Sequence, residues 1–306
     1  MKTMYDLIII GGGPAAVSAG IYAARKKLKT LLITKGWGGQ LSSAPSIENY
    51  PGFDSILGVG LSNKFVDHLK KNDLEIKENF DVKEIKLEGD EKTIRVRGEK
   101  GDFKSKAIII ATGRIPRKLG ISDEEKFIGK GISYCATCDA PLFRDKKVAV
   151  IGGGNTGMEI ALELASYASE VNILVRKPKP RANEYLQNKI KKVSKIKIIT
   201  NATIKELKGD NFIEGLIYQD AISNKMKEID LQGIFIAIGS SANFSLVKNV
   251  VKLNEQNEIK IDSRNRTSQP NIFAAGDVTD VSHKQVVIAA GEGAKAALNA
   301  YEYIKK

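Results

Sequence analysis

The 306-residue sequence is poor in the residues that build disulfide-rich, metal-binding or membrane-spanning proteins. It contains two cysteines, two histidines and one tryptophan. Two cysteines exclude a disulfide framework and favour a metal-binding or catalytic use. No apolar run approaches the roughly 18–20 residues that a membrane helix needs, and the N-terminal apolar run is too short for a signal peptide. We therefore expect a cytoplasmic protein that does not bind a membrane.

Positive charge is in excess, because 48 lysines and arginines stand against 36 acidic residues and give a net charge of +12. The cations form only short, scattered clusters, and no aromatic-plus-basic RNA-binding motif accompanies them. We expect a solvated basic surface or attraction of an acidic partner, and no nucleic-acid binding. The hydrophobic content of 42% is typical of a globular protein, and the length allows two ordinary domains.

The pattern G-x-G-x-x-G/A occurs twice, within residues 5–34 and again within 146–177, each time between an apolar strand and a helix. Its glycines allow a tight turn and a close approach of the backbone to a pyrophosphate, while helix N–H groups point at the phosphates. One match is weak evidence, but two in one chain predict two Rossmann-like domains. The residues that fill the pattern are Gly11, Gly13 and Ala16, then Gly152, Gly154 and Gly157.

Neither segment has the acidic residue that normally ends the second strand and binds the ribose 2′-hydroxyl of NAD. The first segment has Thr34 at this place, and the second has Arg176, Lys177 and Arg181. Cations there favour the 2′-phosphate of NADPH over NADH. The alternative is a solvated basic loop.

Cys135 and Cys138 form a C-x-x-C pair within "ISYCATCDAP" (132–141). Such a pair can be half of a zinc site, a structural disulfide or a redox disulfide. Zinc would need two more ligands, and His68 and His283 lie in unrelated segments without metal-site spacing. We expect no metal, and the two disulfide uses remain open from these residues alone.

Ordered motifs along the whole chain resemble the low-molecular-weight thioredoxin reductases and the related C-terminal half of the flavoprotein subunit of alkyl hydroperoxide reductase. The tail favours the peroxide-reductase branch, whereas "VRKPKPRA" (175–182) favours the thioredoxin-reductase branch. The motifs are "GGGPAA" (11–16), "GGQL" (38–41), "ENYPGF" (48–53), "IIATG" (109–113), "SYCATCDAPLF" (133–143), "VAVIGGGNTGMEIA" (148–161), "FAAGDV" (273–278) and "KQVVIAAGEGAKAA" (284–297).

This resemblance implies an α/β fold with two Rossmann-like three-layer domains, in which a nucleotide domain is inserted into a discontinuous FAD domain. The FAD-binding domain would comprise residues 1–113 and 243–306, and the NAD(P)H-binding domain residues 116–242 with the cysteine pair. Small-residue segments at 111–114 and 237–243 each follow an apolar strand, as crossings between domains should. Relatives form dimers, so we also expect a homodimer.

The resemblance also implies which residues bind the cofactors. For FAD, the glycine turn would hold the pyrophosphate, and further residues would approach the adenosine, the flavin and the ribityl chain. The FAD set is Gly11, Gly12, Gly13, Pro14, Ala15, Thr34, Lys35, Gln40, Asn49, Val82, Asp277, Lys284, Gln285 and Val286. The NADPH set is Gly152, Gly154, Asn155, Thr156, Gly157, Arg176, Lys177 and Arg181.

The implied activity is that of a thioredoxin-disulfide reductase. Electrons would pass from NADPH through FAD to a Cys135–Cys138 disulfide, and from there to a thioredoxin- or glutaredoxin-like protein. Cys138 would face the flavin, Cys135 would attack the substrate disulfide, and Asp139 would act as acid and base, unless it only caps a helix.

The second glycine motif departs from the reductase pattern, because Asn155-Thr156-Gly157 replaces an acidic-small-small run and Val175 stands where histidine is common. One alternative is therefore a ferredoxin-fed or other flavin reductase that does not use NAD(P)H. Another is an NADH-linked reductase of a peroxide-reducing system.

Overall fold

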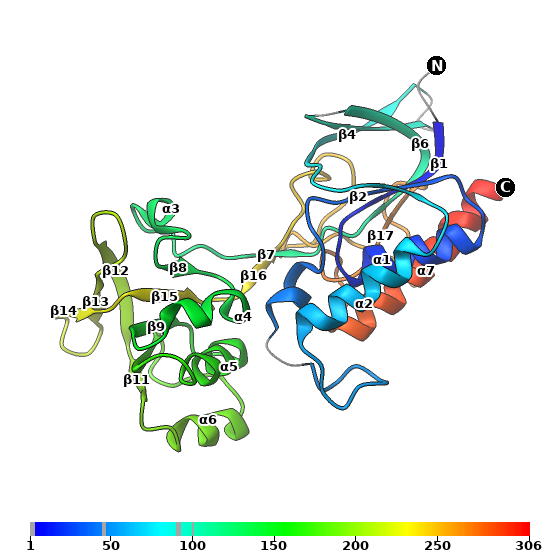
Figure 1. The fold of residues 1–306 in the computed structure, drawn as a ribbon. Helices are drawn as coiled ribbons and strands as arrows, with labels where there is room; N and C mark the ends of the chain where they lie inside the picture. Colours follow the sequence, from blue (N-terminus) through cyan, green and yellow to red (C-terminus); the bar gives the residue numbers. More distant parts are fainter. Residues whose placement is uncertain (1–3, 45–46, 90–92, 100) are drawn as a thin grey trace. The chain divides into compact units, whose positions relative to one another are not determined.

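The computed structural model describes residues 4–44, 47–89, 93–99 and 101–306, without the side chains of Ser43, Thr137 and Cys138. The chain divides into two compact units. Unit 1 comprises residues 1–42, 46–115 and 241–306, and unit 2 comprises 43–45 and 116–240 (Figure 1). Among the described residues, no helix has the length and apolar character to cross a membrane.

Unit 1 is built on a seven-stranded sheet. Its parallel part has the order β3-β2-β1-β6-β17, and β5 and β4 continue from β6 as an antiparallel ribbon. The strands are β1 (Met4–Ile10), β2 (Thr30–Ile33), β3 (Glu75–Lys77), β4 (Val82–Glu88), β5 (Thr93–Gly98), β6 (Gly101–Ile110) and β17 (Ile272–Ala274). The helical segments are α1 (Pro14–Arg25), η1 (Gly39–Ser43), α2 (Gly58–Lys70) and α7 (Val286–Lys305).

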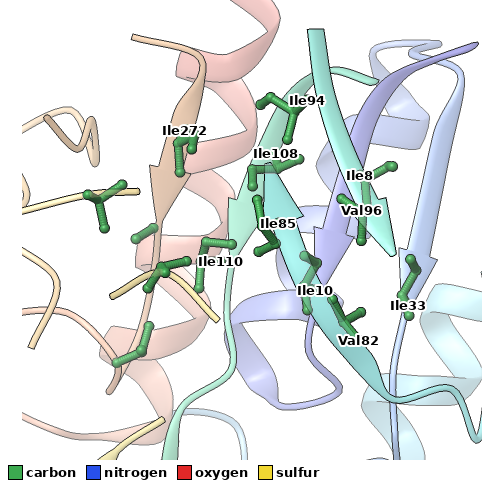
Figure 2. Packing of buried hydrophobic residues seen from close by; sticks show 14 of the residues in the cluster. Ile8, Ile10, Ile33, Val82, Ile85, Ile94, Val96, Ile108, Ile110 and Ile272 are labelled. Carbon is green, nitrogen blue, oxygen red and sulfur yellow. The ribbon is translucent and has the colours of Figure 1, made fainter. Parts of the chain in front are cut away.

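Alternating side chains of β1 build the two cores of unit 1, because successive residues of a strand point to opposite faces. Leu7 and Ile9 pack against α1 and α7, which run beside each other in Figure 1. Ile8 and Ile10 pack against the ribbon of β4 and β5, as Figure 2 shows. The unit therefore has three layers, with helices on one face of the parallel sheet and the ribbon on the other.

Unit 2 repeats this architecture. Its parallel sheet has the order β11-β10-β9-β15-β8, and its antiparallel ribbon the order β12-β13-β14. The strands are β8 (Ile132–Ser133), β9 (Lys147–Ile151), β10 (Glu170–Val175), β11 (Ile196–Thr200), β12 (Ala202–Lys208), β13 (Gly215–Asp220), β14 (Met226–Asp230) and β15 (Gly233–Ile236). The helical segments are α3 (Glu124–Phe127), α4 (Ala136–Asp139), η2 (Ala140–Phe143), α5 (Asn155–Leu164) and α6 (Glu184–Lys191).

The side chains of the central strand β9 alternate between two cores, as those of β1 do. Val148 and Val150 belong to the core under α5 and α6, while Ala149 and Ile151 belong to the core under the ribbon. The predicted fold class, two Rossmann-like three-layer α/β domains with one inserted into the other, is confirmed.

Two short strands, β7 (Arg114–Pro116) and β16 (Ser240–Ala242), pair with each other where the chain passes from one unit to the other. On the unit 1 side, the Thr112 hydroxyl donates to the Asn243 carbonyl at 2.8 Å, and the Asn243 N–H donates to the Gly113 carbonyl at 2.9 Å. Of the two small-residue segments that the sequence marks as crossings, 237–243 contains β16, and 111–114 ends at Arg114, the first residue of β7.

The packing of α1 on α7 yields a test of the fold. A Cβ at Gly293 would lie 2.0 Å from the Ala15 carbonyl oxygen, whereas a Cβ at Gly291 meets no atom within 4 Å. Gly293→Ala should therefore destabilise unit 1 by roughly 1–3 kcal/mol, and Gly291→Ala should stabilise it by roughly 0.5–1 kcal/mol through helix propensity. Urea unfolding followed by the emission of Trp37, the only tryptophan, measures both. Equal effects of the two changes would contradict this packing.

Candidate functional site

Each unit has a sharp glycine turn directly after its central strand. Gly11 has φ +142° and Gly152 has φ +136°, values that suit glycine. A Cβ at Gly11 would lie 2.2 Å from the Ala111 carbonyl oxygen, and one at Gly152 would lie 2.2 Å from that of Ala237. Both turns therefore require glycine for backbone conformation and for close packing.

The helices that follow these turns leave their first N–H groups available for an anion. Gly13 is the N-cap of α1 and Gly154 that of α5; neither helix has a side-chain cap or an acidic residue in its first turn. Pro14 and Ala15 begin α1. In contrast, α6 is capped by Asn183, whose Oδ1 accepts from the Leu186 N–H at 2.9 Å. An uncapped N-terminus beside a glycine turn is suited to a pyrophosphate.

The adenosine side of the expected FAD site forms a tight turn after β2. The Thr34 hydroxyl donates to the Gly36 carbonyl at 2.6 Å and accepts from the Gly36 N–H at 3.1 Å. The turn packs on Gly12, where a Cβ would lie 2.1 Å from the Gly36 carbonyl oxygen. Lys35 is exposed, 3.6 Å from Asp81, and Val82 is buried at the start of β4. The Thr34 side chain therefore shapes the turn.

On the expected flavin side, residues far apart in the sequence come together. The Asn49 Nδ2 donates to the Gln285 Oε1 at 3.1 Å, and Gln285 is the N-cap of α7, which begins with Val286. This N-cap makes no hydrogen bond through its side chain to the described helix. Gln40 is exposed in η1.

Asp277 is a half-buried carboxyl group in unit 1. Burial raises its pKa, while the charges of Lys284 and Arg114 oppose that rise. Within the described part of the chain, its carboxylate accepts no hydrogen bond from the protein. A carboxyl group removed from water without a donor is costly unless a ligand hydroxyl supplies one. Together with the glycine turn, Asp277 fits the needs of a flavin dinucleotide, which carries both a pyrophosphate and a hydroxylated ribityl chain.

Glu258 joins two cations of unit 1 and was missed by sequence reasoning. Its Oε1 lies 2.9 Å from Arg114 Nη1 and 3.2 Å from Lys284 Nζ, and its Oε2 accepts from Asn254 at 2.9 Å. Burial raises the pKa of Glu258, but these hydrogen bonds and charges bring it below its usual value. No local signal could reveal this network, because Arg114 and Glu258 are 144 positions apart.

Unit 2 contains a cavity of about 490 Å³ beside its glycine turn. Of the residues expected to bind NADPH, Gly152, Gly154 and Thr156 line it from the turn. Its described lining contains no carboxylate and six cations, which suits an anionic dinucleotide. The cations are Arg117, Lys118, Arg176, Lys177, Lys179 and Arg181.

Two expected NADPH ligands do not line this cavity. The Asn155 Oδ1 accepts from the Asn183 N–H at 2.9 Å, and a Cβ at Gly157 would lie 2.1 Å from the Gly152 carbonyl oxygen. Both residues therefore shape the turn and its neighbours. Sequence reasoning missed three of the lining cations. Lys179 lies in the same basic run as the predicted ligands, whereas Arg117 and Lys118 come from a distant segment.

The cysteine segment lies at the end of β8. Cys135 is half-buried, immediately precedes α4, and is disulfide-bonded. Cys138, the only other cysteine, belongs to α4 by its backbone, and its side chain lies outside the described atoms. The expected pairing of the two sulfurs therefore stays a prediction.

Asp139 is connected to Cys135 through Ser133. The Ser133 hydroxyl donates to Asp139 Oδ2 at 2.6 Å and accepts from the Cys135 N–H at 3.0 Å. The Asp139 N–H also donates to the Cys135 carbonyl at 3.2 Å. Ser133 lies in the motif "SYCATCDAPLF", but nothing in the sequence showed that its side chain bridges these two residues.

The cysteine segment and the basic cavity share one edge of the parallel sheet of unit 2. Cys135 follows the end of β8, and the glycine turn follows the end of β9, so both lie at carboxyl ends of strands in one parallel sheet. Ala136 and Ala140 pack in the same core cluster as Met158 of α5. This edge is where open parallel sheets bind their ligands.

Comparison with known proteins agrees with this geometry. An alkyl hydroperoxide reductase subunit from Staphylococcus aureus is 41% identical over 304 residues, which cover 99% of this chain and 60% of that protein. The present chain therefore spans less than two thirds of that relative. Lactococcus lactis thioredoxin reductase has a TM-score of 0.91 and 38% identity, with 98% of this chain and 99% of that chain covered. For T. acidophilum thioredoxin reductase the TM-score is 0.89 at 38% identity, covering 98% of both chains.

The model of one protein family, the pyridine nucleotide-disulphide oxidoreductases, matches residues 5–293. The match takes in both glycine turns, the cysteine segment and the beginning of α7. This chain belongs to the pyridine nucleotide-disulphide oxidoreductase family, and its fold is that of the thioredoxin reductases.

Proposed function

We propose that the protein is an FAD-dependent disulfide reductase that takes electrons from NADPH and delivers them to a thioredoxin- or glutaredoxin-like protein. The observation that carries this proposal is the position of the disulfide-bonded Cys135 at the same sheet edge as the basic cavity of unit 2. A second uncapped glycine turn, in unit 1, is free for another dinucleotide.

In this proposal, residues 1–113 and 243–306 bind FAD, and residues 116–242 bind NADPH. Bound FAD supplies two-electron chemistry between a nicotinamide and a disulfide. The first-turn N–H groups of α1 hold the pyrophosphate, and those of α7 favour negative charge near its N-terminus. Asp277 accepts hydrogen bonds from ribityl hydroxyls, and Lys284 contributes a positive charge nearby.

The cysteines carry out thiol–disulfide exchange. The Cys135 thiolate attacks one sulfur of the substrate disulfide, forms a mixed disulfide and releases the first substrate thiolate. The Cys138 thiolate then attacks the Cys135 sulfur, which releases the second substrate thiolate and closes the Cys135–Cys138 disulfide. The two released thiolates take up protons, and in this proposal Asp139 moves a proton beside Cys135. Its support is the link from the Asp139 carboxylate through the Ser133 hydroxyl to the Cys135 backbone N–H.

The basic residues of the cavity favour NADPH, because guanidinium groups bind phosphate with strong charge-assisted hydrogen bonds. An NADH-linked reductase of a peroxide-reducing system is the second candidate, and the 41% identity to an alkyl hydroperoxide reductase subunit of Staphylococcus aureus supports its link to peroxide reduction. A homodimer and a cytoplasmic location, both expected from the sequence, stay predictions.

The cysteine chemistry is tested with two variants. Cys135→Ser should leave reduction of the flavin by NADPH intact but abolish reduction of a thioredoxin disulfide, because the attacking thiolate is gone. Cys138→Ser should block electron transfer from flavin to sulfur. Stopped-flow flavin absorbance and a coupled thioredoxin assay measure these steps. Full thioredoxin turnover in both variants would contradict the mechanism.

The nucleotide preference is tested in the basic cavity. The double change Arg176→Glu with Arg181→Ala should raise the NADPH KM by at least about tenfold, since each charge-assisted contact contributes roughly 1.5–3 kcal/mol. The NADH KM should change little. Lys205→Glu is the control, because Lys205 is exposed on β12 and does not line the cavity. If wild type reduces its flavin equally well with both nucleotides, the basic residues are a solvated surface.

Flavin binding is tested at Asp277. Asp277→Ala should weaken FAD retention by roughly 1–3 kcal/mol, because hydroxyl donors of the ligand lose their buried acceptor. Asp277→Asn keeps one acceptor oxygen and should lie between wild type and Asp277→Ala. Titration of the apoprotein with FAD, followed by Trp37 quenching, gives the three dissociation constants. Identical constants would remove Asp277 from the site, and binding of FMN in place of FAD would refute the dinucleotide assignment.

A further inference from the structure

Glu124 of α3 is a buried carboxylate outside the chemistry described above, with 3% of its surface exposed. Three donors surround it. Its Oε1 accepts from the Leu119 N–H at 2.9 Å and from the Tyr134 hydroxyl at 2.6 Å, and its Oε2 accepts from the Gly120 N–H at 2.9 Å. A buried carboxylate with this many hydrogen bonds is held in one place, because losing any donor leaves part of its charge unsatisfied.

The donors belong to two different parts of the site. Leu119 lines the basic cavity, and Gly120 follows it with φ +73°, which directs the chain around the carboxylate. Tyr134 directly precedes Cys135 in the sequence and packs, like Leu119, against the core under the ribbon of unit 2. Glu124 therefore holds the cavity wall through its hydrogen bonds from Leu119 and Gly120, and the start of the cysteine segment through its hydrogen bond from Tyr134.

The Tyr134 hydroxyl remains a donor in this arrangement. Burial raises the pKa of Tyr134, and the adjacent Glu124 raises it further through the hydrogen bond and its charge. The phenol therefore stays protonated throughout the physiological pH range and keeps its bond to Glu124.

We propose that Glu124 is a positioning residue. It holds the wall of the basic cavity and the cysteine segment in place, and thereby stabilises the disulfide state of Cys135. This inference rests on the proposed function of unit 2. The bond from Tyr134 to Glu124 is observed with Cys135 in a disulfide. The proposal predicts that this bond stabilises the disulfide state more than the dithiol state.

The test compares Tyr134→Phe, Glu124→Gln and the control Glu125→Gln. Glu125 is the next residue of α3, but its side chain is 69% exposed and pairs with Lys118 at the surface. The FAD-loaded protein is equilibrated anaerobically in dithiothreitol redox buffers and quenched with acid, and its thiols are labelled with a maleimide polymer. Because the chain has two cysteines, the labelled fraction reports the disulfide directly.

Tyr134→Phe and Glu124→Gln should each shift the equilibrium with dithiothreitol about tenfold towards the dithiol, which corresponds to a potential about 30 mV higher. Glu125→Gln should match wild type. An unchanged potential in Tyr134→Phe would overturn the proposal even if Glu124→Gln failed to fold. A shift of the same size in Glu125→Gln would also overturn it.

The cavity wall supplies a second measurement, the binding of 2′,5′-ADP by calorimetry. Glu124→Gln should weaken it several-fold, because the amide cannot accept from Leu119, Gly120 and Tyr134 together. Tyr134→Phe should leave it unchanged, and equal weakening by both would indicate general loosening of unit 2 and refute the positioning role. Neither measurement uses NADPH turnover. A result showing that NADPH is not the electron donor would therefore be distinguishable from a failure of the positioning role.

Discussion

Both units depend on one constraint, which is a close backbone contact. In each unit the glycine turn packs against the carbonyl of the residue that follows the neighbouring strand. In unit 1, Gly11 lies against Ala111, and in unit 2, Gly152 lies against Ala237, each with a 2.2 Å approach for a hypothetical Cβ. The hydrogen bonds repeat as well, because Ala111 and Ala237 each donate to the last residue of the central strand at 2.8 Å. A side chain at either glycine would separate the first helix from the strand ends and dismantle the phosphate site.

The same contact has a consequence for the connection between the units. Ala111 directly precedes the segment that leads into β7, and Ala237 precedes the segment that leads into β16. Each glycine turn therefore packs against the residue at which one of the two connecting segments begins. In unit 1 the start of the crossing is further held by Glu258, which pairs with both Arg114 of β7 and Lys284 before α7. Each glycine turn and the start of one crossing therefore share a backbone contact.

Much of the fold could be predicted from local patterns, because the glycine turns and their flanking apolar strands are encoded by residues close together in the sequence. The duplication of the turn also predicted two similar domains. Side-chain roles were harder to predict. Asn155 and Gly157 fit the ligand pattern but shape the turn, and Thr34 satisfies its own backbone. Arg117 and Glu258 acquire their neighbours through the fold, which brings together residues that no sequence spacing relates. The partners of Ser133 are close in sequence, but the sequence did not show that its hydroxyl bridges them.

The central claim is that two redox groups act in series, a flavin in unit 1 and the disulfide of the cysteine segment. Anaerobic titration of the FAD-loaded protein with NADPH, with flavin absorbance and free thiols measured at each step, tests it most directly. The account predicts bleaching of the flavin, the appearance of thiols at both cysteines, and consumption of about two equivalents of NADPH per chain, since each group is a two-electron couple. Bleaching without new thiols, or reduction by ferredoxin but by neither nicotinamide nucleotide, would contradict it.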